Sequence, residues 1–331
     1  MLDVASKIVA TMLQAFYTDQ FVLPLPQTHR FPMRKYSLLR EALTLAGVVE
    51  GGNFHVPQPV TIEQLNLAHD PEYVRRAVTG ELTRSEILRI GFPWSPQLIE
   101  RSRRSSGATY EAGKVALQSG FSANLAGGTH HAQWDCGEGY CVFNDSIVAA
   151  RSLQQDGLIR RAVIVDTDVH QGNGTAQIAR GDDSIFTFSM HGAKNFPLRK
   201  EISDLDIALA DGTTDEEFLD ELETGLKQSI DAARPDIIVY LAGADPFLDD
   251  TLGRLKLTKT GLAARDRLIY QTAITKGLPV VVSMAGGYAR NVLDTVEIHF
   301  QSIAQGAEML LGCPQKTFPD SLNLTSATLS R

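Results

Sequence analysis

Short apolar runs that end in small or polar residues recur along the chain. They cover residues 162–165, 185–188, 237–241 and 280–282. Val and Ile are frequent in these runs, which is typical of strands that are buried on both faces of a sheet. Residues 13–17 and 122–125 have a similar character. We therefore expect a sheet that is built mainly from these segments.

Longer segments with helical spacing lie between these runs. They cover residues 96–118, 215–233, 260–276 and 292–311. In the second of them, Phe218, Leu222 and Leu226 recur at a spacing that places them on one face of a helix. Alternating strands and helices predict an α/β fold, in which helices cover both faces of a central parallel sheet. Because the alternation is continuous, we expect a single domain with three layers.

The composition is that of an ordinary globular protein. The 331 residues include 31 Lys and Arg against 39 Asp and Glu, a formal net charge of −8, and 43% are hydrophobic. These values exclude a disordered chain, a collagen and a coiled-coil rod. An acidic chain is poorly suited to unspecific nucleic-acid binding, which needs a basic face. No run reaches the roughly 20 apolar residues that span a bilayer, and the N-terminus has no secretory signal pattern. We therefore expect no direct nucleic-acid partner and no membrane partner.

The three cysteines are few and unevenly placed. Cys136 and Cys141 lie close together, whereas Cys313 is far along the chain. This spacing predicts neither a disulfide framework nor a structural zinc knuckle, and it suits a reducing compartment. We therefore expect a cytoplasmic protein, with a bacterial source as the simplest interpretation.

Groups that can do chemistry follow four of the predicted strands. They are His130 and His131 after 122–125, Asp166, Asp168 and His170 after 162–165, Asp245 after 237–241, and Tyr288 after 280–282. Ligands of open α/β sheets bind beyond the carboxyl ends of the strands. We therefore expect these side chains to gather at one edge of the sheet.

Asp168 and His170 are two positions apart, so in an extended segment both side chains point to the same side. Asp245, from another strand end, could join them to give two oxygen ligands and one nitrogen ligand. Three protein ligands and one open position are typical of catalytic zinc sites, although these ligand types also admit Fe2+. Taken singly, the segment around Asp168 could be a solvated loop, and Asp245 could cap a helix before Pro246. Their occurrence together favours a metal site.

Adjacent histidines point in different directions, so His130 and His131 can serve two roles. Beside an open metal position, an imidazole can act as a general base toward water. Asp166 and Asn173 are the candidates for holding the two rings in one tautomer. Tyr288 follows two glycines and could donate a hydrogen bond to a developing oxyanion. Taken alone, each of these side chains is more often a packed structural residue.

These residues lie in a series of motifs that resembles a known family. GGTHH, EGYCVFND, DTDVHQGNG, FSMH, LAGADPFLDD and AGGY occur in this order. The series resembles the zinc-dependent histone deacetylases of the arginase-like fold, from about Phe16 to about Leu311. The segments FYTDQFVLPLPQTHRFPMRKY and LRIGFPWS are most similar to the class IV branch and its bacterial relatives. The resemblance implies a histone deacetylase-like catalytic domain over residues 12–320, with residues 1–11 as an N-terminal extension.

The resemblance also implies a role for each residue of the site. The implied metal ligands are Asp168, His170 and Asp245. The implied catalytic residues are His131 as general base, His130 as electrostatic helper, Tyr288 as the group that polarises the amide carbonyl, and Asp166 and Asn173 as partners of the histidines. The implied substrate-binding residues, in a narrow acyl-lysine tunnel, are Gly139, Tyr140, Phe196 and Gly287. A structural potassium ion is implied near Asp166, Asp168, His170, Ser189 and Met190. Arg30 is expected to line an internal exit channel.

The resemblance implies a zinc-dependent hydrolase that removes acetyl or longer acyl groups from lysine side chains of proteins or peptides. The alternative is a deacylase of small molecules such as acetylpolyamines. A binuclear manganese hydrolase of the same fold would need further acidic ligands. A catalytically silent acyl-lysine-binding protein would be expected to lack a ligand, a histidine or the tyrosine.

Two features of this chain bear on its activity. Asn173 stands where many members of the family have Asp, so His131 is expected to be less basic than it would be beside Asp. Residues 90–94 are apolar and lie where the rim of the site is expected, which could favour longer acyl chains. Phe92 and Trp94 could instead be packed core.

Overall fold

The computed structural model describes residues 12–26 and 29–322. The expected N-terminal extension, residues 1–11, lies outside the described residues. The strands are β1 (Ala15–Phe16), β2 (Phe54–His55), β3 (Phe121–Asn124), β4 (Ala162–Asp166), β5 (Ile185–Gly192), β6 (Leu205–Leu209), β7 (Ile237–Leu241) and β8 (Val280–Ser283). The helices are α1 (Arg34–Leu45), α2 (Ile62–Asn66), α3 (Pro71–Thr79), α4 (Arg84–Ile90), α5 (Pro96–Ser119), α6 (Asp145–Gln155), α7 (Asn173–Ala179), α8 (Asp215–Ala233), α9 (Lys259–Lys276) and α10 (Val292–Leu311), with a short 3-10 turn at Gly51–Asn53.

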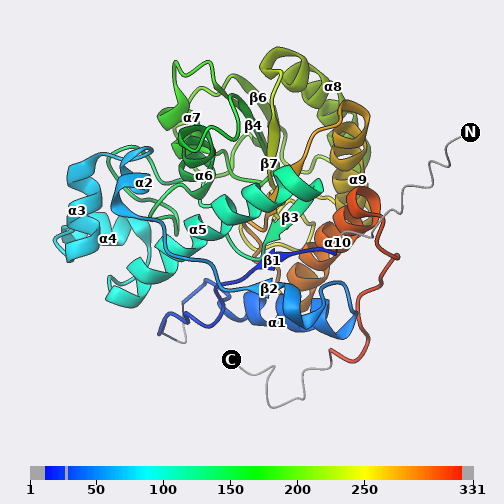
Figure 1. Cartoon of the computed structure of the whole chain (residues 1–331), viewed down its shortest axis with the longest axis horizontal. Helices are drawn as coiled ribbons and strands as arrows, with labels where there is room; N and C mark the ends of the chain where they lie inside the picture. Colours follow the sequence, from blue (N-terminus) through cyan, green and yellow to red (C-terminus); the bar gives the residue numbers. More distant parts are fainter. Residues whose placement is uncertain (1–11, 27–28, 323–331) are drawn as a thin grey trace, which may run out of the picture.

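The strands form one sheet in the order β2-β1-β3-β8-β7-β4-β5-β6, and neighbouring strands are parallel. Helices α1, α8, α9 and α10 cover one face of the sheet, whereas α5, α6 and α7 lie on the other (Figure 1). Each strand is therefore covered by helices, as parallel strands require. The expected three-layer α/β fold with a central parallel sheet is confirmed.

The strands differ from the apolar runs at their ends. β5 continues past the run 185–188 to Gly192, because Ser189 and His191 are buried and this stretch pairs with β6. β1 is shorter than the predicted segment 13–17. The sequence does not predict β6, which lies at the edge of the sheet and alternates exposed with half-buried residues.

The four predicted helices, α5, α8, α9 and α10, match their predicted ranges closely, because local signals mark their ends, whereas the sequence does not predict the other six helices of the described residues. In α5, the Ser95 side chain accepts a hydrogen bond from the Leu98 N–H, and Pro96 occupies the first turn. The helix ends at Gly120, whose φ of +98° favours glycine. No helix within residues 12–26 and 29–322 is long and apolar enough to cross a membrane.

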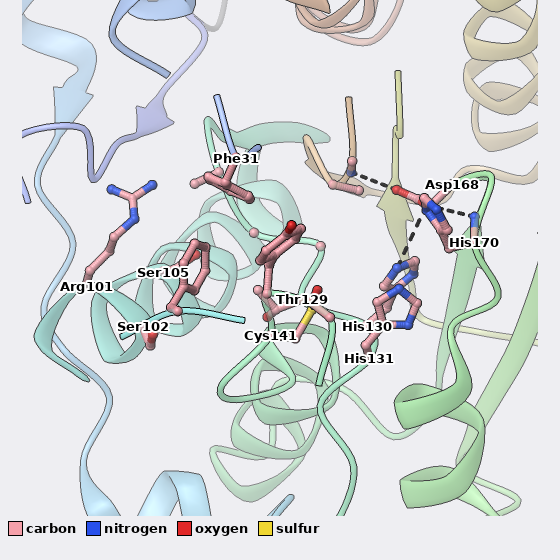
Figure 2. A pocket seen from close by; sticks show the side chains of 18 of the residues that line it. Phe31, Arg101, Ser102, Ser105, Thr129, His130, His131, Cys141, Asp168 and His170 are labelled. Atoms are coloured by element: carbon pink, nitrogen blue, oxygen red, sulfur yellow. Dashed lines mark hydrogen bonds and ion pairs between the residues drawn. The ribbon is translucent and has the colours of Figure 1, made fainter. Parts of the chain in front are cut away.

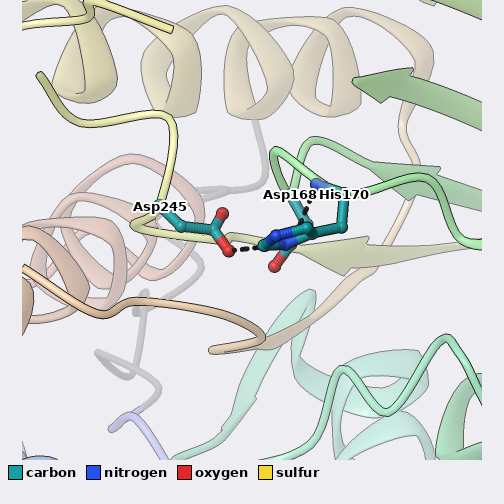
Figure 3. A group of neighbouring side chains, drawn as sticks. All are labelled: Asp168, His170 and Asp245. Atoms are coloured by element: carbon teal, nitrogen blue, oxygen red, sulfur yellow. Dashed lines mark hydrogen bonds and ion pairs between the residues drawn. The ribbon is translucent and has the colours of Figure 1, made fainter. Parts of the chain in front are cut away.

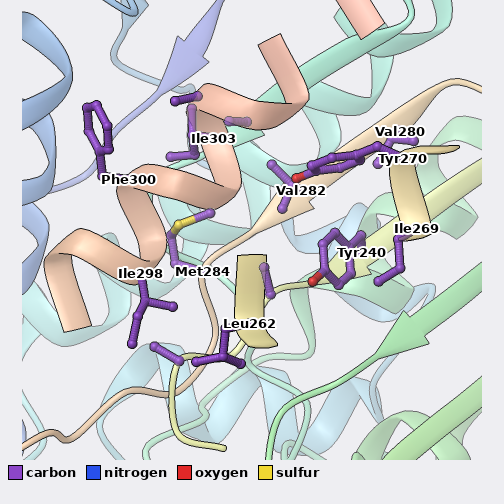
Figure 4. Packing of buried hydrophobic residues seen from close by; sticks show 14 of the residues in the cluster. Tyr240, Leu262, Ile269, Tyr270, Val280, Val282, Met284, Ile298, Phe300 and Ile303 are labelled. Atoms are coloured by element: carbon purple, nitrogen blue, oxygen red, sulfur yellow. The ribbon is translucent and has the colours of Figure 1, made fainter. Parts of the chain in front are cut away.

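Apolar side chains fill both spaces between the sheet and its helices. Alternate residues of a strand point to opposite faces, so Val163 and Val165 join one cluster and Ile164 joins the other. Figure 4 shows the first cluster, in which Val280 and Val282 of β8 pack among side chains of α9 and α10. Burying one such side chain contributes about 1.5–3 kcal/mol. Packing on both faces therefore stabilises the sheet and holds the loops at its carboxyl edge in place.

Candidate active site

Side chains from four neighbouring strands meet at the carboxyl edge of the sheet. The strands β3, β8, β7 and β4 are adjacent, and the segments after them carry the residues of the site. An inner cavity of about 80 Å³ and an outer cavity of about 590 Å³ adjoin these residues. The linings of the two cavities share His131, Gly139, Tyr140, His170 and Tyr288.

Asp168, His170 and Asp245 form a buried cluster of metal-binding atoms (Figure 3). One ligand atom from each residue lies within 4.8 Å of the others. The Nδ1 atom of His170 is 3.0 Å from Asp168 Oδ1 and 3.1 Å from Asp245 Oδ2. Ligands at about 2.0–2.1 Å from a tetrahedral zinc ion lie roughly 3.3 Å apart. The spacing of these three atoms therefore fits such an ion.

Backbone amides hold the two carboxylates in place. The Gly286 N–H donates to Asp168 Oδ2 at 2.7 Å, and the Val169 N–H donates to Asp245 Oδ1 at 2.9 Å. The other oxygen of Asp245, Oδ2, is buried and has no well-aligned hydrogen-bond donor among the described residues. Buried polar atoms are rarely left in this state. This oxygen is therefore suited to a metal ion.

The cluster also favours an added positive charge. Burial and the Asp168 carboxylate raise the pKa of Asp245 to about 7. Burial would lower the pKa of His170, but Asp168 and Asp245 raise it to about 10. Both shifts show that a positive charge between these side chains is stabilising, whether a proton or a metal ion supplies it. One imidazole and two carboxylates suit Zn2+ or Fe2+.

His130 and His131 lie side by side, with ring centroids 4.1 Å apart, and both are buried. His130 Nδ1 is 2.6 Å from Asp166 Oδ2, whereas His131 Nδ1 is 2.6 Å from Asn173 Oδ1. Burial would lower the pKa of His130, but the charges of Asp166 and Asp168 raise it to about 9. Burial and the charge of His130 hold the pKa of His131 well below its usual value. At neutral pH the pair therefore holds one imidazolium and one neutral imidazole.

The side-chain amide of Asn173 determines which nitrogen of His131 is basic. Asn173 Nδ2 donates to Glu138 Oε2 at 3.1 Å, so Asn173 Oδ1 faces the histidine and accepts from its Nδ1. The proton on Nδ1 leaves Nε2 of His131 free to accept another. Glu138 stands directly before Gly139 in the motif EGYCVFND, but the motif alone does not indicate this contact.

The hydroxyl of Tyr288 remains protonated at this site. Burial and the carboxylates of Asp245 and Asp168 raise the pKa of Tyr288 well above 10. The Tyr288 N–H donates to Asp250 Oδ2 at 2.6 Å, which fixes the backbone. Tyr288 can therefore act as a hydrogen-bond donor but not as a base.

A buried lysine supports the turn before Tyr288. Lys35 Nζ donates to the carbonyls of Ala285 at 3.2 Å and Gly287 at 3.4 Å, and it lies 5.3 Å from the centre of the Tyr288 ring. Ala285 has a φ of +51° and Gly287 a φ of +153°, so this turn needs firm anchors. The sequence does not predict this role, although Lys35 shares helical spacing with the buried Ala42 in α1.

Gly139, Tyr140 and Phe196 line the outer cavity. The Phe196 ring stands perpendicular to that of His131, with centroids 4.9 Å apart. A Cβ atom at Gly139 would lie 2.7 Å from His131 Cδ2 and 3.4 Å from Phe196 Cε1. A side chain at position 139 would therefore crowd the passage beside His131. The Tyr140 ring lies further in, 6.2 Å from that of Tyr288.

The inner cavity extends from the histidine pair to Arg101 of α5 (Figure 2). Arg101 is buried, donates to the Thr18 carbonyl at 2.7 Å and stacks on the Tyr36 ring at 4.8 Å. The expectation for Arg30 is wrong, because Arg30 is exposed and does not line this cavity. Arg30 lies on an irregular segment before α1, whereas Arg101 lies on the buried face of a long helix.

The apolar segment 90–94 divides between the two interpretations. Phe92 is buried in the core and also lines the inner cavity, where its ring is 5.1 Å from that of Tyr140. Trp94 is half-buried and donates from Nε1 to the Ala77 carbonyl at 2.8 Å. Trp94 lines neither cavity, so its place is that of a packed structural residue.

The residues expected around a potassium ion are also brought together. Asp166 of β4 stands opposite Ser189 of β5 in the sheet register, and Met190 follows. The Asp168 N–H donates to Asp166 Oδ1 at 3.1 Å. Asp166, Ser189 and Met190 are buried next to Asp168 and His170 of the metal-binding cluster, which are buried as well.

Comparisons with known proteins show the family and the fold to which this chain is similar. A family model described as the histone deacetylase domain matches residues 29–303. An uncharacterized protein of Picosynechococcus is 42% identical over 283 residues, covering 86% of this chain and 94% of that protein. Histone deacetylase 2 of Arabidopsis thaliana is 26% identical, covering 89% of this chain and 79% of that protein. The crystal structure of an HDAC homolog from Aquifex aeolicus is similar in fold, with a TM-score of 0.79 at 20% identity, covering 96% of this chain and 93% of that one.

Proposed function

The chain belongs to the histone deacetylase domain family, and we propose that it is a metal-dependent hydrolase that removes acyl groups from lysine side chains of proteins. Family membership supports a deacetylase or deacylase activity, and therefore an amidohydrolase. One observation carries the proposal. The buried metal-binding cluster lies beside a neutral histidine, His131, and a protonated phenol, Tyr288.

We propose that Asp168, His170 and Asp245 hold Zn2+, with Fe2+ as the alternative ion. When bound, such an ion polarises the amide carbonyl and lowers the pKa of water. We also propose a structural K+ near Asp166 and Ser189, where it would support the loop that carries the ligands.

In this proposal His131 is the general base. Its Nε2 atom takes a proton from the attacking water, while Asn173 holds the Nδ1–H. His130, paired with Asp166, keeps its positive charge close to the developing negative charge. The Tyr288 hydroxyl donates a hydrogen bond to the carbonyl oxygen as that oxygen becomes an oxyanion. His131 then gives its proton to the leaving lysine amine.

We propose that the acyl-lysine enters through the outer cavity. The long aliphatic stem of lysine suits a passage with Phe196 and Tyr140 in its walls. The passage stays open at Gly139, where a side chain would crowd it. Gly287, expected among the substrate-binding residues, lies in the turn that carries Tyr288 but lines neither cavity, whereas its neighbour Gly286 lines the inner one. An acyl chain longer than acetyl would extend toward the inner cavity and the Phe92 ring. The proposal therefore covers acetyl and longer acyl groups.

Three finer assignments belong to the same proposal. We propose that the chain belongs to the class IV branch and its bacterial relatives, because the segments LRIGFPWS and FYTDQFVLPLPQTHRFPMRKY resemble that branch. Its location is proposed to be the cytoplasm, because the spacing of its cysteines suits a reducing compartment. Residues 12–320 are proposed as the catalytic domain.

A panel of acyl-lysine peptides, from acetyl to myristoyl, tests this function. We expect hydrolysis of at least one peptide, its loss on adding a chelator, and slower hydrolysis of an acetylated polyamine. If the polyamine were hydrolysed and every peptide left intact, the small-molecule alternative would replace the proposal. If no compound were hydrolysed by metal-loaded protein, the enzymatic assignment would fail.

A further inference from the structure

The outer cavity has a cationic rim. Arg89, Lys194 and Arg254 line it, and Glu138 is the one carboxylate residue of its lining within the described part of the chain. Glu138 already accepts a hydrogen bond from Asn173. The whole chain has a formal net charge of −8, so the charge at this opening is opposite to that of the molecule.

Nearby carboxylates only partly neutralise the rim. Lys194 Nζ is 3.7 Å and Arg254 Nη1 is 3.2 Å from the same atom, Asp211 Oδ2. One carboxylate shared by two cations leaves an excess positive charge on that side. The side chains of Lys194 and Arg254 remain 73% and 55% exposed, so they can meet a substrate.

Arg89 lies in the last turn of α4, on a different segment from Lys194 and Arg254. It is exposed, and no ion-pair partner of Arg89 occurs among residues 12–26 and 29–322. Its side chain contacts the Cys136 thiol, whose pKa is raised by burial, so this partner is uncharged at neutral pH, and Glu138 and Glu86 act on Arg89 only at longer range. Arg89 is therefore a second source of uncompensated positive charge.

Hydrogen bonds fix the backbone segments that carry these cations. The Gly139 N–H donates to the Arg89 carbonyl at 3.1 Å, which places Arg89 beside the passage to the histidines. The Asn195 side chain donates to the Leu252 carbonyl at 2.8 Å. This bond joins the loop that carries Lys194 to the loop that carries Arg254. The three segments that carry the cationic rim are therefore held around the opening by hydrogen bonds.

We propose that this rim selects acyl-lysines whose neighbouring residues carry carboxylates. The inference rests on the proposed lysine deacylase function and names the substrate class of the same site. Residues that flank an acyl-lysine advance by about 3.3–3.6 Å each in an extended peptide. Carboxylates in the first few flanking positions therefore lie well within the screening length of about 10 Å at 0.1 M salt. The same rim repels lysine-rich peptides and polyamines.

Three peptides test this selectivity. They share one acetyl-lysine and carry Asp and Glu, Asn and Gln, or Lys and Arg at the flanking positions. We expect kcat/KM to fall in that order, by roughly tenfold between the acidic and basic peptides at low salt, and the difference to shrink at high salt. Equal values for all three peptides at low salt would overturn the proposal.

Charge-reversal variants locate the effect. The triple variant Arg89→Glu, Lys194→Glu and Arg254→Glu should reverse the order of the peptides. Lys227→Glu makes one such charge reversal at an exposed position of α8, on a helix away from the opening, and should leave the order intact, whereas each single reversal at the rim should weaken the preference. A preference for acidic peptides that persisted in the triple variant would contradict the role of the rim.

Peptide affinity, measured by fluorescence anisotropy, separates this inference from the function on which it rests. Failure to cleave the neutral peptide with any acyl group from acetyl to myristoyl would reject the proposed hydrolase. The order of the three dissociation constants would still decide whether the rim prefers carboxylates. Tighter binding of the acidic peptide supports the inference, and equal or reversed affinities contradict it.

Discussion

The Nδ1 atom of His131 lies 2.6 Å from Asn173 Oδ1, while its neighbour His130 meets the carboxylate of Asp166 at the same distance. An amide orients an imidazole but carries no charge that would stabilise its cation, whereas a carboxylate both orients the ring and stabilises the cation. Two adjacent rings therefore take opposite protonation states. This difference assigns the role of base to His131 and the role of fixed positive charge to His130.

Asn173→Asp should raise the pKa of His131 by about one unit, because a carboxylate stabilises the imidazolium. The neutral ring is the active form, so the acidic limb of the kcat/KM profile should move to higher pH by a similar amount. Gln271→Glu adds the same charge at an exposed position of α9 and should not move the pH profile. An acidic limb that stayed in place in Asn173→Asp would contradict the role of His131.

Tyr288→Phe should lower kcat by about a hundred- to a thousandfold, because it removes one donor to the developing oxyanion. Metal content, measured by mass spectrometry, should remain that of the wild type, since Tyr288 is not among the ligands. Tyr110→Phe removes a hydroxyl that contacts Asp156 at the surface and serves as the control. Near-normal turnover by Tyr288→Phe would reject its role.

Lys35→Met should lower both stability and turnover. It leaves the buried carbonyls of Ala285 and Gly287 without their donor, which costs about 1–3 kcal/mol per group. Denaturant unfolding measures the first effect, and steady-state kinetics the second. Because Lys35 positions Tyr288, kcat should fall more than KM changes, and Lys35→Arg should restore part of it. A destabilised variant with unchanged kcat would limit Lys35 to a structural role.

His69 should make the protein less stable in acid. Its Nδ1 donates to the Gln133 carbonyl at 2.8 Å and its Nε2 accepts from the Asn144 N–H at 2.9 Å. Burial lowers the pKa of His69 to about 4. The unfolded chain binds this proton from about pH 6.5 downward and the folded chain only near pH 4, so stability falls between these values. The loss amounts to about 3 kcal/mol at 1.36 kcal/mol per unit.

Urea unfolding at pH 7 and pH 4.5 measures this loss. His69→Gln cannot take up the proton, so its free energy of unfolding should change less between the two pH values than that of the wild type. Other buried histidines titrate in both proteins and cancel in the comparison. Equal changes in both would show that His69 does not carry the effect.

The sequence predicts the fold because the buried strands are short, apolar and followed by recognisable turns. It also predicts which residues gather at the carboxyl edge, since parallel strands end there together. It does not find Arg101 or Lys35, because charged residues on helices normally face water and their burial depends on tertiary packing. The prediction for Arg30 is wrong for the complementary reason, since a position next to α1 along the chain does not place a side chain in the inner cavity.

The sequence does not predict the cationic rim, for a related reason. Arg89, Lys194 and Arg254 come from three distant segments, and the acidic total charge gives no sign that they meet. Only the folded loops bring them to one opening. Charge patterns of this kind need the structure, whereas the motifs of the metal-binding cluster do not.

The most direct test of the proposed metal-dependent catalytic centre is hydrolysis of a neutral acetyl-lysine peptide by protein that is stripped of metal and then reloaded. We expect activity to disappear with the metal and to return on adding about one equivalent of Zn2+ per chain. Asp245→Asn, which removes the charge of one ligand but keeps its shape, should bind the ion weakly and regain little activity. Undiminished hydrolysis by the stripped protein, or full activity of Asp245→Asn, would contradict the assignment of this cluster as the catalytic centre.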